Sequence, residues 1–312
     1  MSSVYTSTFA DPSCRNVREY GGKASGLAAL TAAGLPVPAG FAIGTAAFRA
    51  FRAGNRMPEE VAAEIRDRYR LLCEQTAVAD VAVAVRSSAT AEDSAAASFA
   101  GGFDTTVDVT GIDAVLTHVR GCWGGVAAAR AVDYARASGI DHTGIEMAVV
   151  VQRSVRAEAA GVMFTISPVT GDRSRIVIEA SWGLGIAVVG GEVTPDRWVV
   201  DKIGLTVVEH TPGDKRVEYR RGHTAVEVDP ARRALPSLTD EQVIALARLG
   251  KQIERTQGGP QDIEFAVEGG APVLLQCRRE TVWSARPPAP RFAAGGLTSW
   301  ISSAVTPLDE AA

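Results

Sequence analysis

Residues 261–278 carry acids, an amide and an arginine at spacings that could bind a divalent metal. Asp262 and Glu264 alternate with apolar residues, so a strand here would place both carboxylates on one face and bury the other. A Gly-Gly pair follows, and a second apolar run then carries Gln276 and Arg278. Carboxylate and amide oxygens are ligands that Mg²⁺ accepts, together with water and substrate phosphates. The segment therefore predicts a β-hairpin that holds a metal between Glu264 and Gln276.

The loop of this hairpin decides which residues face each other. A two-residue turn at Gly269-Gly270 would pair Glu264 with Leu275, whereas a three-residue loop through Ala271 would pair Glu264 with Gln276. We predict the three-residue loop, because it brings the two oxygen ligands together. The residues expected to share the ligand-bearing face of the return strand are Leu274, Gln276 and Arg278.

Composition excludes several classes of protein. The chain has 312 residues, 46% of them hydrophobic, which is enough for two or three units that each form a core. The net charge of −4 and the absence of a Lys/Arg run give no sign of a nucleic-acid partner or an anionic membrane surface. No leader-like start and no long apolar run is visible, so we expect a cytoplasmic protein.

The cysteines and histidines are scattered and give no metal-site spacing. We expect free, structural thiols at Cys14, Cys73, Cys122 and Cys277. No role is assigned to His118, His142, His210 or His223.

Apolar periodicity predicts two lobes followed by an extended linker. The predicted helices span residues 24–33, 59–76, 112–119, 123–138 and 239–256. The predicted strands span residues 81–85, 145–151, 159–164, 174–180, 196–202 and 205–210, followed by the hairpin. The expected division is an N-terminal lobe over 1–152, a C-terminal lobe with the metal-binding hairpin over 153–284, and a Pro-rich linker over 285–312.

Three further places offer donors suited to an anion. Lys23 follows Gly21-Gly22 at a predicted helix start, where backbone N–H groups and the helix dipole favour negative charge. Arg86 follows a five-residue apolar strand, so we expect it to project from the end of a sheet. The Gly-rich stretch 98–106 has hydroxyl donors that could fold over phosphates. Each feature alone is common, and neither a P-loop nor a dinucleotide fingerprint is present.

Nine short motifs occur in the order seen in one known family. They are Gly-Gly-Lys (21–23), Val-Arg-Ser-Ser-Ala (85–89), Ser-Phe-Ala-Gly (98–101), Val-Gln (151–152), Ala-Gly-Val-Met-Phe-Thr (160–165), Pro-Val-Thr-Gly (168–171), Ala-Ser-Trp-Gly-Leu-Gly (180–185), Thr-Pro-Asp (194–196) and Gln-Asp-Ile-Glu (261–264). The chain to about residue 283 resembles the nucleotide-binding domain of phosphoenolpyruvate synthase, pyruvate phosphate dikinase and rifampicin phosphotransferase.

That resemblance implies an α/β (α+β) ATP-grasp fold, in which two lobes close on ATP. The strand that carries Gln152 would form the hinge between the lobes. The catalytic residues that the resemblance implies are Lys23, Arg86 and Arg278. The implied ATP-binding residues are Lys23, Arg86, Gly101, Gly102, Thr105, Gln152, Asp262, Glu264, Gln276 and Arg278. Mg²⁺ would be held by Glu264 and Gln276.

The chain departs from the family pattern at two positions and lacks a further part. Gly102 stands where relatives often carry Gln, and Ile186 where they often carry Glu, which puts fine phosphate contacts in doubt. No segment resembles the motif of the phosphate-accepting histidine found in the family's swivelling domain. The chain is therefore expected to be one piece of a split enzyme or a shortened form of a longer protein.

The resemblance implies a dikinase-like phosphotransferase component. It would pass the β-phosphoryl of ATP to a histidine on a separate chain with a swivel domain and an acceptor-binding domain, leaving AMP and phosphate. The final acceptor would be a small hydroxyl- or enol-bearing molecule. Two alternatives stay open: an ATP-grasp carboxylate ligase, which would release ADP, and a nucleotide-sensing subunit without turnover.

Overall fold

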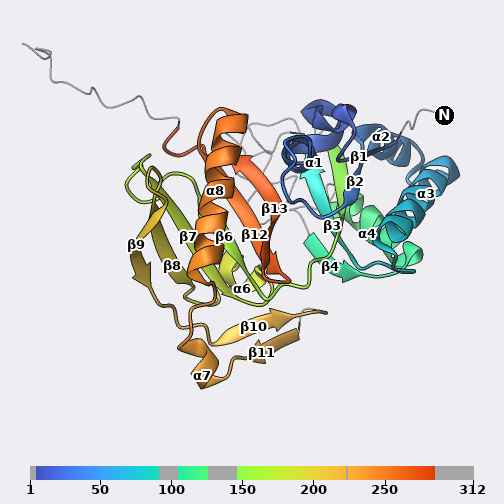
Figure 1. Cartoon of the computed structure of the whole chain (residues 1–312). Helices are drawn as coiled ribbons and strands as arrows, with labels where there is room; N and C mark the ends of the chain where they lie inside the picture. The colour runs from blue at the N-terminus through green and yellow to red at the C-terminus, as the bar shows by residue number, and fades with distance from the viewer. Residues whose placement is uncertain (1–4, 91–104, 126–145, 223, 285–312) are drawn as a thin grey trace, which may run out of the picture. The chain divides into compact units, whose positions relative to one another are not determined.

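The computed structural model describes residues 5–90, 105–125, 146–222 and 224–284. Residues 1–280 form one compact unit, and residues 281–312 form a separate segment. Helices and strands are mixed along the chain, which confirms the predicted α/β class at this level (Figure 1). None of the helices in the described ranges is long and apolar enough to cross a membrane. The predicted division after residue 152 falls near the end of a strand and stays a prediction.

The first part of the compact unit is built on a five-stranded antiparallel sheet. Its strands, in spatial order, are β1 (Thr6–Thr8), β2 (Gly40–Ile43), β5 (Met147–Arg153), β3 (Val83–Ala89) and β4 (Thr105–Val109). The helices around it are η1 (Pro12–Arg15), α1 (Val17–Ala32), α2 (Thr45–Gly54), α3 (Glu59–Thr76) and α4 (Ile112–Gly125). Alternate residues of β3 and β5 pack with α2, α3 and α4 into one apolar core. One face of the first sheet is therefore buried against α2, α3 and α4, and this packing holds β3 and β5 in place.

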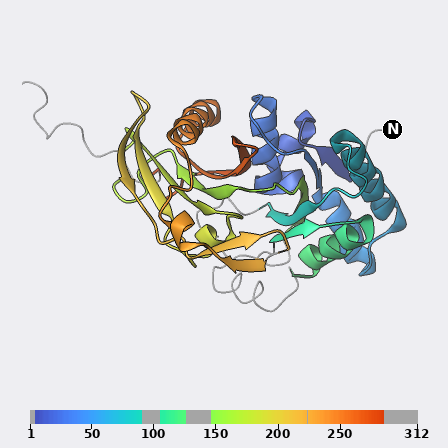
Figure 2. The same ribbon diagram turned by 60° about the horizontal axis from the view of Figure 1, so that its bottom comes forward.

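The second part is built on a six-stranded antiparallel sheet. Its strands, in spatial order, are β13 (Ala271–Arg279), β12 (Gln261–Glu268), β6 (Ala159–Phe164), β7 (Arg175–Trp182), β8 (Asp196–Asp201) and β9 (Thr206–Thr211). Helix α8 (Asp240–Gln257) crosses one face and buries it (Figures 1 and 2). The remaining elements are α6 (Ile186–Val189), α7 (Pro230–Arg233) and the hairpin of β10 (Val217–Arg220) and β11 (Thr224–Glu227). The opposite face of this sheet carries polar side chains such as Asp262 and Glu264 as well as apolar ones such as Ala160 and Ala266.

Most elements predicted in the second part are confirmed, with ends shifted by one or two residues, and α3 matches its predicted range. Helix α2 and the strands β1, β2, β4, β10 and β11 were not predicted. Helix α4 runs without a break through the predicted gap between 119 and 123, and residues 126–138 lie outside the described ranges.

Strand β3 extends further than predicted, so Arg86 does not project from a sheet end. Arg86 lies inside β3 and pairs with Val150 of β5. The strand continues because the Ser88 hydroxyl has two partners on α1: it donates to the Tyr20 carbonyl at 2.9 Å and accepts from Ala24 N–H at 3.3 Å. Arg86 is therefore held by strand pairing on a rigid sheet.

A break in α1 explains why Gly21 is needed. Gly21 has φ +74° and ψ 172°, so the helix is interrupted and starts again beside Lys23. A Cβ at Gly21 would lie 2.2 Å from the Ser88 carbonyl oxygen, which no side chain can accept. The interruption thus couples α1 to β3 by close backbone contact.

Replacing Gly21 with alanine is expected to destabilise the fold by about 3 kcal/mol, combining the cost of alanine in this extended positive-φ conformation, which is essentially restricted to glycine, with that of overpacking. Gly34→Ala is the matched control: Gly34 also has positive φ, at +70°, but a Cβ there meets nothing within 4 Å. The control should cost only about 1 kcal/mol. Urea unfolding curves measure both values, and equal losses would mean that contact with Ser88 contributes nothing.

A buried ion pair ties β8 to the segment before β10. The side chains of Lys215 and Asp196 are 1% and 0% exposed and form a direct Nζ–Oδ1 ion pair. Asp196 also accepts from Gly213 N–H at 2.8 Å and from the N–H and hydroxyl of Ser237 at 2.7 and 2.8 Å. Because every oxygen of this carboxylate is satisfied, the buried charge is tolerated. Asp196 has a structural role in the described contacts.

The four cysteines are buried and form no disulfide, as predicted. Burial raises the pKa of the Cys14 and Cys277 thiols to about 12. At pH 8 only about 1 in 10⁴ of either thiol would be ionised, since each pH unit below the pKa is a factor of ten. We expect almost no reaction of these thiols with iodoacetamide in the native protein and full reaction in denaturant, as read by mass spectrometry. Fast native labelling of either one would contradict the burial described.

Candidate functional site

Strands β12 and β13 form the predicted hairpin with the predicted partners, but its turn is shorter than predicted. Glu268 pairs with Ala271, so the turn has only two residues, Gly269 and Gly270, and both have positive φ. The predicted three-residue loop is wrong. A β-bulge on β13 supplies the extra residue instead, so Glu264 still pairs with Gln276.

The bulge also changes which residues share a face. Leu274 pairs with Phe265, and both are buried in the core under α8. The expectation that Leu274 shares a face with Gln276 is therefore wrong. The extra residue, Leu275, is free of the regular ladder, and its carbonyl accepts a hydrogen bond from Arg86 Nη1 at 3.0 Å.

Arg86 also forms an ion pair that joins the two sheets. Its Nη2 atom lies 2.8 Å from Glu264 Oε2, and the two side chains are 13% and 29% exposed. Arg86 is on β3 in the first sheet, whereas Glu264 is on β12 in the second. The structure thus brings together two predicted site residues that are 178 positions apart in sequence.

Buried polar atoms without a partner gather beside this ion pair. They are Arg86 Nε, Asp262 Oδ1 and Gln276 Oε1. The pKa of Asp262 lies above its usual value, chiefly because the carboxyl group is buried. The charge of Arg278 opposes this rise, and the charge of Glu280 adds to it. Arg278 Nε lies 3.3 Å from Asp262 Oδ2. One unpartnered donor and two unpartnered acceptors side by side suit a ligand with both an anionic group and a cation.

A small cavity of about 220 Å³ lies where α1 meets β13. Its lining includes Gly22 and Lys23 from α1 and Gln276 and Arg278 from β13. The two elements approach closely, since a Cβ at Gly26 would lie 2.8 Å from the Cys277 carbonyl oxygen. The fold therefore brings Lys23 to the same region as the hairpin ligands.

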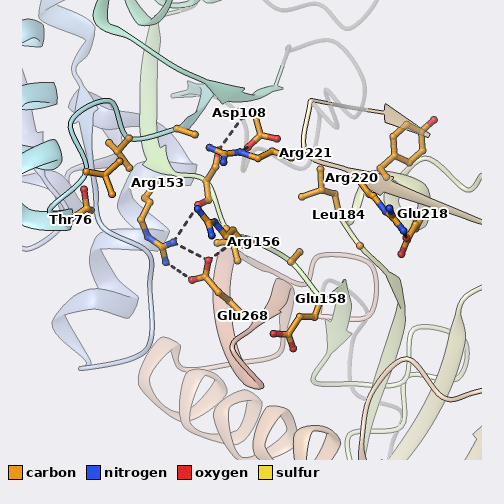
Figure 3. A pocket seen from close by; sticks show the side chains of 18 of the residues that line it. Thr76, Asp108, Arg153, Arg156, Glu158, Leu184, Glu218, Arg220, Arg221 and Glu268 are labelled. Carbon is orange, nitrogen blue, oxygen red and sulfur yellow. Dashed lines mark hydrogen bonds and ion pairs between the residues drawn. The ribbon is translucent and has the colours of Figure 1, made fainter. Parts of the chain in front are cut away.

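A larger cavity of about 990 Å³ is lined by the connection from β5 to β6 and by residues of β4, β10 and β12 (Figure 3). Its wall carries many charged side chains that the sequence did not single out. They include Asp108, Arg153, Arg156, Glu158, Glu218, Arg220, Arg221, Arg232 and Glu268. These residues come from segments spread between 108 and 268, and no local motif marks them.

The remaining predicted site residues are placed as follows. Gln152 is 2% exposed, pairs with Gly40 and Ala84 in the first sheet, and donates from Nε2 to the Pro38 carbonyl at 3.4 Å. Thr105 begins β4 and pairs with Arg86. Gly101 and Gly102 lie outside the described residues. Hinge and phosphate roles for these residues stay predictions.

The hairpin offers a fitting ligand set for Mg²⁺. Glu264 supplies a carboxylate and Gln276 an unpartnered amide oxygen, and Mg²⁺ commonly takes one or two protein ligands while keeping water and substrate phosphates. Within the described ranges no group of three or more His, Cys, Asp or Glu could hold a metal on its own. The arrangement suits a metal that arrives with a phosphorylated substrate.

The described residues form a mixed helix-and-strand protein in which Arg86, Glu264 and Gln276 lie together. Residues 53–293 match the family described as pyruvate phosphate dikinase, AMP/ATP-binding domain. The chain belongs to this family.

Named relatives extend the match. A probable phosphoenolpyruvate synthase of Methanothermobacter thermautotrophicus is 39% identical, over 88% of this chain and 46% of its own length. A phosphoenolpyruvate synthase of Pyrococcus furiosus is 44% identical, over 72% of this chain and 29% of its own. The chain spans less than half the length of these curated relatives. A solved structure, D-cycloserine synthetase, is 14% identical with a TM-score of 0.34, covering 80% of this chain and 59% of its own, a likeness too low to define a shared fold.

Proposed function

We propose that the chain binds Mg²⁺ and ATP between its two sheets and donates a phosphoryl group in a dikinase-like reaction. The observation that carries this proposal is the joining of Arg86 and Glu264 at 2.8 Å, with unpartnered atoms of Arg86, Asp262 and Gln276 around it. The family match to an AMP/ATP-binding domain supports ATP as the nucleotide. The ATP-grasp arrangement, with two lobes closing on ATP, is part of the same proposal.

The cations would hold the triphosphate. Arg86 is fixed by β3 pairing and offers an unpartnered Nε–H, and Lys23 and Arg278 line the adjoining small cavity. Charge-assisted hydrogen bonds of this kind are the main contribution of a protein to phosphoryl transfer, because the reaction depends on alignment and on stabilising charge. Lys23, Arg86 and Arg278 are the proposed catalytic residues.

Glu264 and Gln276 would hold Mg²⁺, which supplies charge neutralisation at the phosphates when bound. In the structure Arg86 pairs with Glu264, so the same carboxylate can orient the arginine and ligate the metal. Asp262 remains beside them and orients Arg278. Thr105, the first residue of β4, is proposed to cover the phosphates together with Gly101 and Gly102, which lie outside the described residues.

The nucleoside is proposed to lie toward the larger cavity. The face of β12 that carries Glu264 continues with Ala266, which packs with Val155 and Ala160 in a small apolar cluster. Ala160 and Ala266 are buried, whereas Val155 lines the larger cavity together with charged side chains, and such a mixture of apolar and polar groups is typical of small-molecule sites. Gln152 lies close to this cavity, because the next residue, Arg153, lines it.

The proposed reaction transfers the β-phosphoryl of ATP to a histidine on another chain or domain. The bond between the β-phosphorus and the bridging oxygen to the α-phosphate breaks, AMP leaves, and a phosphorus–nitrogen bond forms. One water attacks the γ-phosphorus, the bond between the γ-phosphorus and the oxygen that bridges it to the β-phosphate breaks, and orthophosphate leaves, while the protons of the histidine N–H and of the water pass to the released phosphates and solvent. The greater length of the relatives supports a partner that carries this histidine and the acceptor site, and their names, phosphoenolpyruvate synthase, support a small enol-type acceptor.

The test is incubation of the chain with Mg²⁺, β-³²P-labelled ATP and a histidine-bearing candidate partner. Label on the partner together with AMP is the expected result. ADP as the nucleotide product would point instead to a ligase, and tight ATP binding with no product from any partner would point to a nucleotide-sensing subunit.

A further inference from the structure

A second ion pair joins the two sheets, at the opposite end of β12 from Asp262. Arg153, the last residue of β5, holds Glu268, the last residue of β12, in a two-pronged contact: Nη1–Oε1 is 3.0 Å and Nη2–Oε2 is 2.7 Å. Figure 3 shows the two side chains facing each other on the wall of the larger cavity. We propose that Arg153 and Glu268 are positioning residues that fix the separation of the sheets where the nucleoside binds. This inference rests on the proposed ATP binding.

The connection between the sheets is pinned at this pair. Arg156 N–H donates to Glu268 Oε1 at 2.8 Å, so the same carboxylate holds the β5 end and the connection that follows it. On the first-sheet side, Arg153 N–H donates to the Ala39 carbonyl at 2.8 Å. On the second-sheet side, Glu158 N–H donates to the Val267 carbonyl at 2.9 Å. Movement of one sheet against the other must therefore strain or break the Glu268 contacts.

The position of the pair along β12 relates it to the nucleotide. Glu264, Ala266 and Glu268 alternate with buried core residues and so share one face of the strand. Glu264 and Glu268 are separated by about 13 Å, since a strand rises about 3.3 Å per residue. Each of these glutamates binds an arginine of the first sheet, and the apolar Ala266 lies between them. Ala266 itself is buried, so a nucleotide with its phosphates at Glu264 that runs along β12 would place its nucleoside toward Glu268, in the larger cavity that Val155 and Glu268 line.

The ion pair between Arg153 and Glu268 is partly shielded from solvent, so it can hold the two sheets in a defined arrangement. The Arg153 and Glu268 side chains are 26% and 24% exposed, and the Arg153 guanidinium is the main cause that lowers the pKa of Glu268. A two-pronged arginine–carboxylate contact has a defined direction as well as charge, which a single-point contact lacks. Such a contact can set a distance between two packed sheets.

The test compares AMP and ATP binding by calorimetry in the full chain and in Arg153→Gln, Glu268→Gln and the double variant. Each single change should weaken both nucleotides by about tenfold, which corresponds to about 1.4 kcal/mol. The double variant should bind no more weakly than the singles, because both changes remove one contact. Arg175→Gln and Asp201→Asn are matched controls, since Arg175 and Asp201 also form a 2.7 Å pair with exposures of 35% and 28%, but within one sheet.

Several results would overturn the inference. One is unchanged nucleotide affinity in Arg153→Gln. Another is an additive loss in the double variant, which would mean independent contacts with the nucleotide. A third is a fall in melting temperature that is well beyond that of the control variants and proportional to the loss of nucleotide affinity. That result would mean that the pair only stabilises the fold. If the unaltered chain bound neither nucleotide, the proposed function itself would fail.

Discussion

Glu264→Gln is expected to lower label transfer from ATP by about 10³-fold while leaving the fold intact, because loss of one charge-stabilising group at a transition state typically costs about 10²–10³-fold and here a metal ligand is also weakened. The change keeps the size of the side chain, so Arg86 can still donate a hydrogen bond to it. The melting temperature should therefore shift little. The rate of phosphoryl transfer at saturating Mg²⁺ and ATP is the measurement.

Glu254→Gln is the matched control for this change. Glu254 accepts from Lys202 at 2.8 Å with side-chain exposures of 24% and 14%, close to the values for Glu264 and Arg86. It lies on α8, on the other face of the sheet. Activity near that of the unaltered protein in Glu264→Gln, or an equal loss in Glu254→Gln, would contradict the assignment of Glu264 as a metal ligand.

Arg86→Ala is expected to weaken ATP binding by about 100-fold and AMP binding by only a few fold, since hydrogen bonds to charged groups contribute about 1.5–3 kcal/mol and AMP lacks the β- and γ-phosphates. The reason is local: Arg86 Nε–H is buried without a partner beside Asp262 and Gln276. Titration calorimetry with each nucleotide gives the two affinities. This selective loss differs from the equal loss for AMP and ATP expected at Arg153.

Two comparisons make the Arg86 result interpretable. Lys202→Ala removes another cation of similar exposure from an ion pair and should leave both affinities unchanged. Arg86→Lys keeps the charge but lacks the planar fork that contacts Leu275 and Glu264 and leaves Nε–H for a phosphate, so partial recovery of ATP binding is expected. An equal loss of ATP and AMP in Arg86→Ala would show that the arginine supports the sheets and does not select for phosphates.

The hairpin shows what the sequence could predict. The alternation of acids with Ile263 and Phe265 is a local signal, and the strand and its buried face follow from it. The pairing of Glu264 with Gln276 was predicted from a three-residue loop that the structure does not have, and it arises from the bulge instead. The bulge at Leu275 could not be predicted in this way. It depends on Leu274 packing against Phe265 under α8, which is a tertiary contact.

Long-range contacts account for the other differences. The strand with Arg86 extends because Ser88 bonds to residues of α1 that are more than 60 positions earlier. The larger cavity was missed because its walls come from distant segments, and Arg153 and Glu268 meet only after both sheets form. The sequence predicts a helix start next to Lys23. The structure confirms this, because α1 is interrupted at Gly21 and its second part begins beside Lys23.

The most direct measurement is a crystal structure of the chain with Mg²⁺ and a non-hydrolysable ATP analogue. We expect Mg²⁺ at about 2.1 Å from oxygens of Glu264 and Gln276, with a phosphate oxygen bonded to Arg86 Nε–H. We also expect the adenosine in the larger cavity, on the side of Arg153 and Glu268. A triphosphate bound elsewhere, with Glu264 and Gln276 away from the metal, would contradict the proposed ATP and Mg²⁺ site.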